Sequence, residues 1–412
     1  MRNGYETSAL ALAATCLLPL VACGGTPTAT QVSECSNITY AAPSGLANNI
    51  VFTLDKAYPC GQYANGDWWV APPTTGGTVT ITAISPAQRL RAASVTNGAM
   101  VNPTSTASQG FDGDAPGYSA GQTAIVPLAI NTTTVPITSV VKAASVPAIN
   151  RPALQFAAVL TVINAAADKT TQFRPSYFGA SGKFQLSVSS INTASLGQSD
   201  LTSVPSVAAY TFANVVTATT GLQIDHLGGD NLNEWLHAKD NAYNGSGYGS
   251  NVSLLYSKNM MRFASNDFNY SNSTHKQALI NYLQYCIDLA GNVNGGTPYV
   301  GVGGYGFGRL LPVLFAGQVL QNSTITNLAS SGTFGENTAF YKSTATGKIL
   351  HGEMDAYGAP WTWPNVYFRG QVENVGSRTI RDPMGWTDSG SGSFAGTYLA
   401  WYRAGPATQQ AR

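Results

Sequence analysis

The chain is short of charged residues. Its 21 basic and 20 acidic side chains make up 10% of 412 residues, against about 25% in an average soluble protein. The formal charge of +1 argues against a nucleic-acid partner, because nucleic-acid binders present a basic face. It also argues against disorder driven by net charge. The 43 glycines and 21 prolines favour turns over a helical bundle or coiled coil, and indicate an exported, partly β-rich protein.

Several catalytic and metal-binding motifs are missing as well. The sequence has no G-x-S-x-G elbow, no P-loop and no H-E-x-x-H motif, so serine-hydrolase, P-loop and metalloprotease chemistry have no support. The four histidines and five cysteines do not follow the spacing of a zinc site. We therefore expect no metal and no other cofactor.

The apolar run from Ala9 to Ala22 is too short to cross a membrane comfortably, which takes about 20 residues. Its length and its place after Arg2 predict a signal peptide over residues 1–22. The segment from Leu20 to Cys23 resembles the lipobox of bacterial lipoproteins. This resemblance implies lipidation at Cys23 and a location in the cell envelope, with the membrane reached through the anchor. The alternative is an ordinary signal peptide, which would release a secreted protein.

Three cysteines remain beyond the leader and the lipidation candidate. Cys35 and Cys60 are near neighbours in a polar region, so a disulfide between them is plausible. A loop of this size contributes about 3 kcal/mol in the chain-entropy model. Cys286 lies on the apolar side of a predicted helix, which favours a buried structural thiol over a nucleophile.

After a small, polar linker over residues 23–35, residues 36–217 alternate short β-type runs with turn residues. Strands are predicted over 50–54, 78–84, 124–130 and 158–163. Asn65-Gly66-Asp67 before Trp68 predicts a hairpin turn, because Asn and Gly tolerate positive φ. We interpret this region as an antiparallel β-sandwich.

Residues 218–403 have a helical pattern instead, so the predicted fold class is α+β with a mainly α-helical second domain. Helices are predicted over 252–263, 275–290 and 309–320, the last apolar almost all round and therefore buried. Thr274 and Gln277 form a capping-box pattern, and Gly291 is a typical helix stop. An irregular C-terminal lobe follows, and residues 404–412 are predicted to be a disordered tail.

Residues suited to catalysis concentrate in this second half, which holds all four histidines and 12 of the 20 acidic residues, counted from Asp225. Asp225 and His226 lie at the predicted junction between domains, where clefts form. Glu234 and His237 follow at a helical spacing that places them on one face, although a metal site would need further ligands. The alternative is a hinge in which Asp225 caps a helix.

A second candidate is the glycine-rich segment 301–309, which contains Tyr305 and Arg309. Its G-x-G-x-x-G spacing is not a dinucleotide loop, because no β-α-β alternation surrounds it. Arg309 has the chemistry to hold a substrate carboxylate bidentately, or to pair with a structural acid.

A third candidate combines one imidazole, carboxylates and aromatic rings. His351 and Glu353 are followed by Tyr357, Trp361 and Trp363. Carboxylates perform acid–base chemistry on sugars, and aromatic faces stack on pyranose rings. The alternative is a polar turn beside core tryptophans.

A β-rich region followed by helices and a glycine-rich loop before a buried helix resembles secreted bacterial proteins with an (α/α) toroid, such as polysaccharide lyases. In such lyases a Tyr or His removes a proton next to a uronate carboxylate, and an Arg, Asn or His neutralises that carboxylate. The resemblance implies such roles for Tyr305, Arg309, His226 and His351.

Three hypotheses follow, of which the first is an exported polysaccharide-degrading enzyme. A lyase is slightly preferred over a glycoside hydrolase, which would use a carboxylate pair such as Glu353 and Asp225. The second is a glycan-binding surface lipoprotein, and the third is a structural envelope protein. In each, the partner is a polysaccharide or another extracellular polymer. The first predicts that segments 225–226, 305–309 and 351–353 converge on one cleft.

Overall fold

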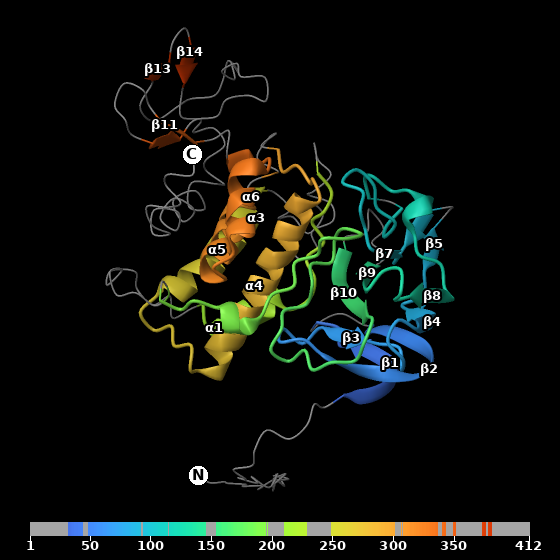
Figure 1. Cartoon of the computed structure of the whole chain (residues 1–412). Helices are drawn as coiled ribbons and strands as arrows, with labels where there is room; N and C mark the ends of the chain where they lie inside the picture. Colours follow the sequence, from blue (N-terminus) through green and yellow to red (C-terminus); the bar gives the residue numbers. More distant parts are fainter. Residues whose placement is uncertain are drawn as a thin grey trace, which may run out of the picture. The chain divides into compact units, whose positions relative to one another are not determined.

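The computed structural model describes residues 32–43, 48–91, 94–113, 115–145, 154–194, 196, 210–228, 249–300, 306, 308–336, 340–342, 349–351, 373–375 and 378–380. These residues have a mixed α+β fold, as predicted (Figure 1). The predicted leader, the lipidation candidate Cys23 and the C-terminal tail lie outside these ranges.

The main sheet is curled and has eight strands in the order β7-β9-β10-β3-β2-β4-β8, with β1 also paired to β2. All its pairs are antiparallel except β10 with β3, which is parallel. Its strands are β1 (Ser33–Tyr40), β2 (Ile50–Gln62), β3 (Trp68–Val70), β4 (Thr78–Ser85), β7 (Ala99–Val101), β8 (Leu128–Asn131), β9 (Ile137–Ser145) and β10 (Leu154–Ile163). Short separate hairpins are β5 (Arg89–Arg91) with β6 (Ser94–Thr96), β11 (Phe340–Lys342) with β12 (Ile349–His351), and β13 (Glu373–Val375) with β14 (Arg378–Ile380).

Alternation of side chains explains how the sheet holds two cores. Val140 of β9 packs with the residues of one face, including Phe52 and Leu160. Val141, the next residue, packs on the other face, where the chain segments carrying Tyr177 and Ile224 cover the sheet. Successive residues of a strand point to opposite faces, so both faces of β9 and β10 are buried.

The predicted hairpin and disulfide are both confirmed. The β2–β3 hairpin closes with the Tyr63 N–H donating to the Asp67 carbonyl at 2.8 Å, and Gly66 has a φ of 88°. Cys35 on β1 and Cys60 on β2 form a disulfide with 5.9 Å between their Cα atoms.

The described helices are α1 (Phe212–Thr219), α3 (Gly249–Ala264), α4 (Ser273–Asn294), α5 (Leu310–Val319) and α6 (Ser323–Ser331), with 3₁₀ turns η1 (Ala120–Gln122) and η2 (Val188–Ser190). They share one apolar core, which also takes in Phe173 from the segment after β10. The predicted helix over 309–320 is confirmed as α5, with Pro312 in its first turn and most of its side chains buried.

Helix α4 is longer than predicted at both ends. Its N-cap is Asn272, whose Oδ1 accepts from the N–H groups of Thr274 at 2.9 Å and His275 at 3.2 Å, so the predicted Thr274 cap is wrong. The helix continues past Gly291. This glycine does not end the helix; it leaves space for the close approach of Ser176. A Cβ atom at Gly291 would lie 2.4 Å from the Cβ of Ser176.

Two finer predictions about the architecture are corrected. The described strands of the first region form one curled sheet plus a small hairpin, and not the two facing sheets of a sandwich. The described helices do not show an (α/α) toroid. Both predictions depended on local patterns, which identify strands and helices but not which of them pair. The boundary near residue 217 stays a prediction.

Candidate functional site

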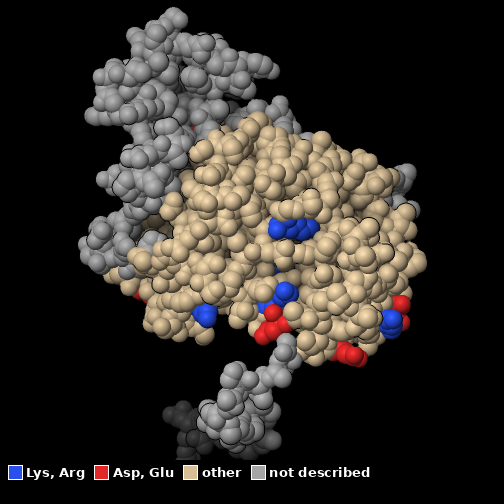
Figure 2. All heavy atoms as spheres, viewed as in Figure 1, with Lys and Arg blue, Asp and Glu red and all other residues tan. Residues whose placement is uncertain are grey.

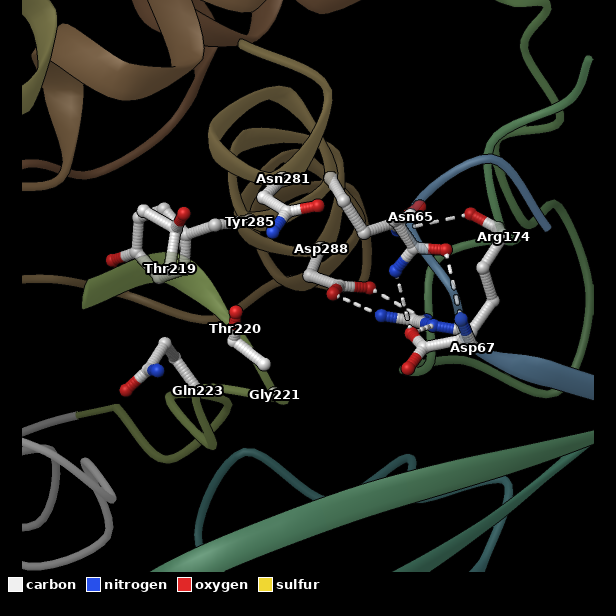
Figure 3. A pocket seen from close by; sticks show the side chains of 11 residues that line it. Asn65, Asp67, Arg174, Thr219, Thr220, Gly221, Gln223, Asn281, Tyr285 and Asp288 are labelled. Carbon is white, nitrogen blue, oxygen red and sulfur yellow. Dashed lines mark hydrogen bonds and ion pairs between the residues drawn. The ribbon is translucent and has the colours of Figure 1, made fainter. Parts of the chain in front are cut away.

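A small pocket lies where the sheet region meets α1 and α4 (Figure 3). The β2–β3 turn, the segment at Arg174, the residues after α1 and one face of α4 supply its walls. The space between its walls is about 280 Å³ with open solvent included, and the enclosed part is about 10 Å³, room for about one water molecule. The lining is Asn65, Asp67, Arg174, Thr219, Thr220, Gly221, Gln223, Asn281, Gln284, Tyr285 and Asp288. Amides, hydroxyls and carboxylates therefore dominate this pocket.

Arg174 holds one wall of the pocket together. Its Nε donates to Asp67 Oδ2 at 2.6 Å, and its Nη1 donates to Asp288 Oδ1 at 3.0 Å. Its Nη2 donates to Asp288 Oδ2, and its Nη1 also donates to the carbonyl of Pro175 at 2.7 Å. Because Asp67 follows β2 and Asp288 is on α4, this guanidinium joins the sheet region to the helices.

The Arg174 side chain is only 1% exposed, so its charge needs these two partners. Burial alone lowers the pKa of Arg174, but the carboxylates of Asp288 and Asp67 outweigh burial and raise it above its ordinary value. Burial likewise raises the pKa of Asp288 despite Arg174. With a forked guanidinium on both its oxygens and the Tyr177 N–H at 3.1 Å, Asp288 stays ionised at neutral pH.

Two amide side chains in the lining have polar atoms without a partner among the described residues. Gln223 is 3% exposed, and neither its Oε1 nor its Nε2 is hydrogen-bonded there. Gln284 donates through Nε2 to the Arg174 carbonyl at 3.0 Å, but its Oε1 has no such partner. Buried polar groups in native proteins are nearly always satisfied, so unused donors and acceptors beside a pocket point to a bound ligand or water.

The sequence-predicted residues Asp225 and Arg309 lie together behind the pocket's lining, where the lining residue Tyr285 interacts electrostatically with both. Arg309 Nε donates to Asp225 Oδ2 at 3.0 Å, and its Nη2 donates to Oδ1 at 3.1 Å. Both side chains are 1% exposed. This is the pairing with a structural acid that the sequence left open for Arg309, and Asp225 caps no described helix.

His226 lies beside this pair in an aromatic environment. Its ring stacks on Phe178 at 5.2 Å and meets the edges of Phe111 and Tyr177. The Tyr177 hydroxyl accepts from the Asp225 N–H at 3.2 Å and lies 3.2 Å from His226 Nδ1, to which it is placed to donate. Burial lowers the pKa of His226 to about 3, so the ring is neutral at physiological pH.

The structure does not describe the side chains of the remaining predicted site residues. Tyr305, His237, Glu353, Tyr357, Trp361 and Trp363 lie outside the described residues, as does Glu234. The backbone of His351 ends β12, and its side chain is not described. Asp225 and Arg309 form a buried ion pair, and the convergence of segments 225–226, 305–309 and 351–353 on one cleft stays a prediction.

Sequence reasoning missed the residues that shape the observed pocket. Arg174 and Asp67 lie in the first half, which the sequence does not mark as a site, and Asp288 lies within the predicted helix over 275–290. The available signal was Asp288, a charged residue beside the apolar stripe of α4. Charged residues are almost never buried unless paired, so its position indicated a buried partner.

Another missed residue is Glu336, a buried carboxylate that follows α6 and contacts the N-terminal end of α5. Its Oε1 accepts from the Gly308 N–H at 2.7 Å, and it is 1% exposed. Burial raises its pKa.

Within the part of the chain that is described, no group of His, Cys, Asp and Glu side chains is arranged to hold a metal ion. Cys286 is a free thiol with no exposed surface, as predicted.

No family model, curated protein or solved structure matches this chain. The function therefore has to be argued from the pocket itself.

Proposed function

We propose that this protein is an exported surface lipoprotein that binds a glycan, and that the mouth of the pocket between the β2–β3 turn, α1 and α4 contacts it. The observation that carries the proposal is the chemistry of the lining, which combines amides, hydroxyls and carboxylates. A sugar hydroxyl both donates and accepts a hydrogen bond, and amide side chains offer both complements.

Unused hydrogen-bonding capacity supports the same proposal. The enclosed part of the pocket is about 10 Å³, room for about one water molecule, so a sugar unit would contact the open mouth of the pocket. Gln223 and Gln284 have amide atoms with no partner among the described residues. A ligand rich in hydroxyls would satisfy them.

Binding is favoured over cleavage because the charged groups are already engaged. Asp67 and Asp288 both accept from Arg174, which leaves no protonated acid opposite a free carboxylate, as a glycoside hydrolase requires. Arg309 is buried in an ion pair with Asp225, so it is not placed to neutralise the carboxylate of a uronate, as the lyase hypothesis requires.

Export and anchoring depend on the leader and on cysteine chemistry. The lipobox resemblance at Cys23 is the argument for a lipid anchor. The Cys35–Cys60 disulfide supports export, since disulfides persist in oxidising compartments. No helix in the described ranges is long and apolar enough to span a bilayer.

The test is glycan binding by the full processed protein, purified in detergent and probed with an array of neutral, amino and acidic oligosaccharides. Titration calorimetry on the best ligand would then compare the parent with Gln223→Met. This variant removes the unused amide at similar volume, so affinity should fall about tenfold, the loss of roughly one hydrogen bond to a buried group.

The same variant gives a second readout that a purely structural role would not produce. Burying an amide without partners costs roughly 1–3 kcal/mol, so Gln223→Met should be at least as stable as the parent in the absence of ligand. Gln62→Met, at an exposed position outside the pocket, is the control. If no saccharide on the array binds, the proposed function is wrong. Shortening of the oligosaccharides during incubation would instead indicate an enzyme.

A further inference from the structure

The charge of the pocket is set by three residues of its described lining. Asp67 and Asp288 each carry a negative charge, and Arg174 carries the positive one, which leaves a net charge of −1. No second Lys or Arg belongs to the lining. Figure 2 shows only scattered basic and acidic side chains on the face in view, with no basic patch among them.

Arg174 is not available to a ligand carboxylate. Its guanidinium makes four hydrogen bonds within the protein, to Asp67, to both oxygens of Asp288 and to the Pro175 carbonyl. A substrate anion would have to compete with two carboxylates that are already in place. It would also approach a site whose net charge repels it.

Lys183 interacts electrostatically with Arg174 and Asp288, but its hydrogen bonds are directed elsewhere. The Lys183 ammonium lies 2.8 Å from the carbonyl of Tyr177 and 3.3 Å from that of Ser176, and it is not part of the lining. The groups that do remain for a ligand are neutral, namely the Gln223 amide and the Gln284 Oε1 atom. They can both donate to and accept from a hydroxyl, but they do not neutralise an anion.

Resting on the proposed function, we infer that the pocket selects uncharged, hydroxyl-rich sugar units and rejects uronates, with Asp67 and Asp288 as the residues that set this specificity. The uronate substrate that the lyase hypothesis requires is therefore the class that this pocket disfavours. A neutral polysaccharide, or a neutral unit within a mixed one, is the ligand.

The first measurement compares neutral oligosaccharides with uronic acids of the same ring stereochemistry, such as galactose against galacturonic acid oligomers of equal length. Binding to the full processed protein should be about tenfold weaker or more for the acid at low salt, and the difference should shrink as salt is added. Equal or tighter binding of the uronate at low salt would overturn the inference while leaving the proposed function intact.

The second measurement adds a cation to the wall without disturbing the Arg174 bonds. Thr220 is exposed, lines the pocket and donates its hydroxyl to the Val216 carbonyl at 2.6 Å. In Thr220→Lys, affinity for the uronate relative to the neutral sugar should rise about tenfold. The control is Thr82→Lys, at an exposed threonine on β4 whose hydroxyl also donates to a backbone carbonyl, at 3.2 Å.

The outcomes separate the two proposals. An unchanged uronate-to-neutral ratio in Thr220→Lys, or the same rise in Thr82→Lys, contradicts selection by the charge of the pocket. A failure of every saccharide to bind to the parent removes the proposed function, and this inference with it.

Discussion

Lys142 places an amine within the apolar core of the sheet, and replacing it by methionine should stabilise the protein. It lies on β9 and is 1% exposed. Its neighbours across the sheet are Ala99 on β7 and Ala158 on β10, both buried in the same core as Val140. The two small alanines leave room for a long side chain, which Met fills at similar volume and without a charge.

The magnitude follows from the shift in the pKa of this lysine. Burial lowers it from 10.5 to about 7. Between these two values the unfolded chain binds the proton and the folded chain does not, so lowering the pH destabilises the fold. Each unit of difference is worth about 1.4 kcal/mol, so the full penalty near pH 7 is roughly 3–5 kcal/mol.

The assay is urea unfolding of the parent and of Lys142→Met at pH 7 and pH 10, with linear extrapolation to water. Near pH 10 the unfolded chain is about to lose the proton as well, so the advantage of the variant should shrink to about 1 kcal/mol. Lys276→Met, at an exposed position on α4, is the control and should change little at either pH.

Two results would refute this reasoning. A stabilisation of the same size at both pH values would show that packing, and not protonation, is responsible. A variant less stable than the parent at pH 7 would mean that the ammonium group has a partner in the fold worth more than its burial costs.

Other expected outcomes concern the ion cluster, the cysteines and the closest helix contact. Arg174→Met should lower the free energy of unfolding in urea by about 3–5 kcal/mol, since it leaves buried carboxylates without a cation. An unchanged midpoint would contradict the role of Arg174 in joining the sheet region to the helices. Cys60→Ser should lower the free energy of unfolding by about 3 kcal/mol relative to the oxidised parent, and equal stability of both proteins would argue against a structural disulfide. Cys23→Ser should move the protein out of the membrane fraction or leave it unprocessed, and fractionation like the parent would disprove the anchor. Gly291→Ala should destabilise by roughly 1–3 kcal/mol through overpacking against Ser176, whereas a gain in melting temperature would show that the helix can shift.

Features that depend on neighbouring residues could be predicted from the sequence. The turn at Asn65–Asp67 has residues that adopt positive φ, and the hairpin β2–β3 forms there. The apolar run of α5 is buried, and Pro312 is tolerated in its first turn. Cys35 and Cys60, 25 residues apart, are joined because β1 and β2 pair along their length.

Local patterns failed where a second segment decides the outcome. Strand β8 was predicted from residue 124 but begins at Leu128, after Pro127, which has no N–H to donate to a sheet. Gly291 looked like a helix stop, but it lies inside α4 because the backbone needs space for Ser176. The strand prediction gave Pro127 no special role, whereas Gly291 was recognised as special and its role came from its surroundings.

By itself the sequence determined the α+β class, the longer helices, the first hairpin and the disulfide, because periodicity, turn chemistry and short loops act within a few residues. Only the tertiary structure decided that β3 pairs in parallel with β10, which closes one curled sheet in place of a sandwich. It also decided that Arg174 meets Asp288, 114 residues further along the chain, while Arg309 is sealed against Asp225. A charged residue in a sequence must end up either in solvent or beside a partner of opposite charge. Long-range packing decides which partner it meets, and so decides that Arg174 lines a pocket while Arg309 forms a buried ion pair.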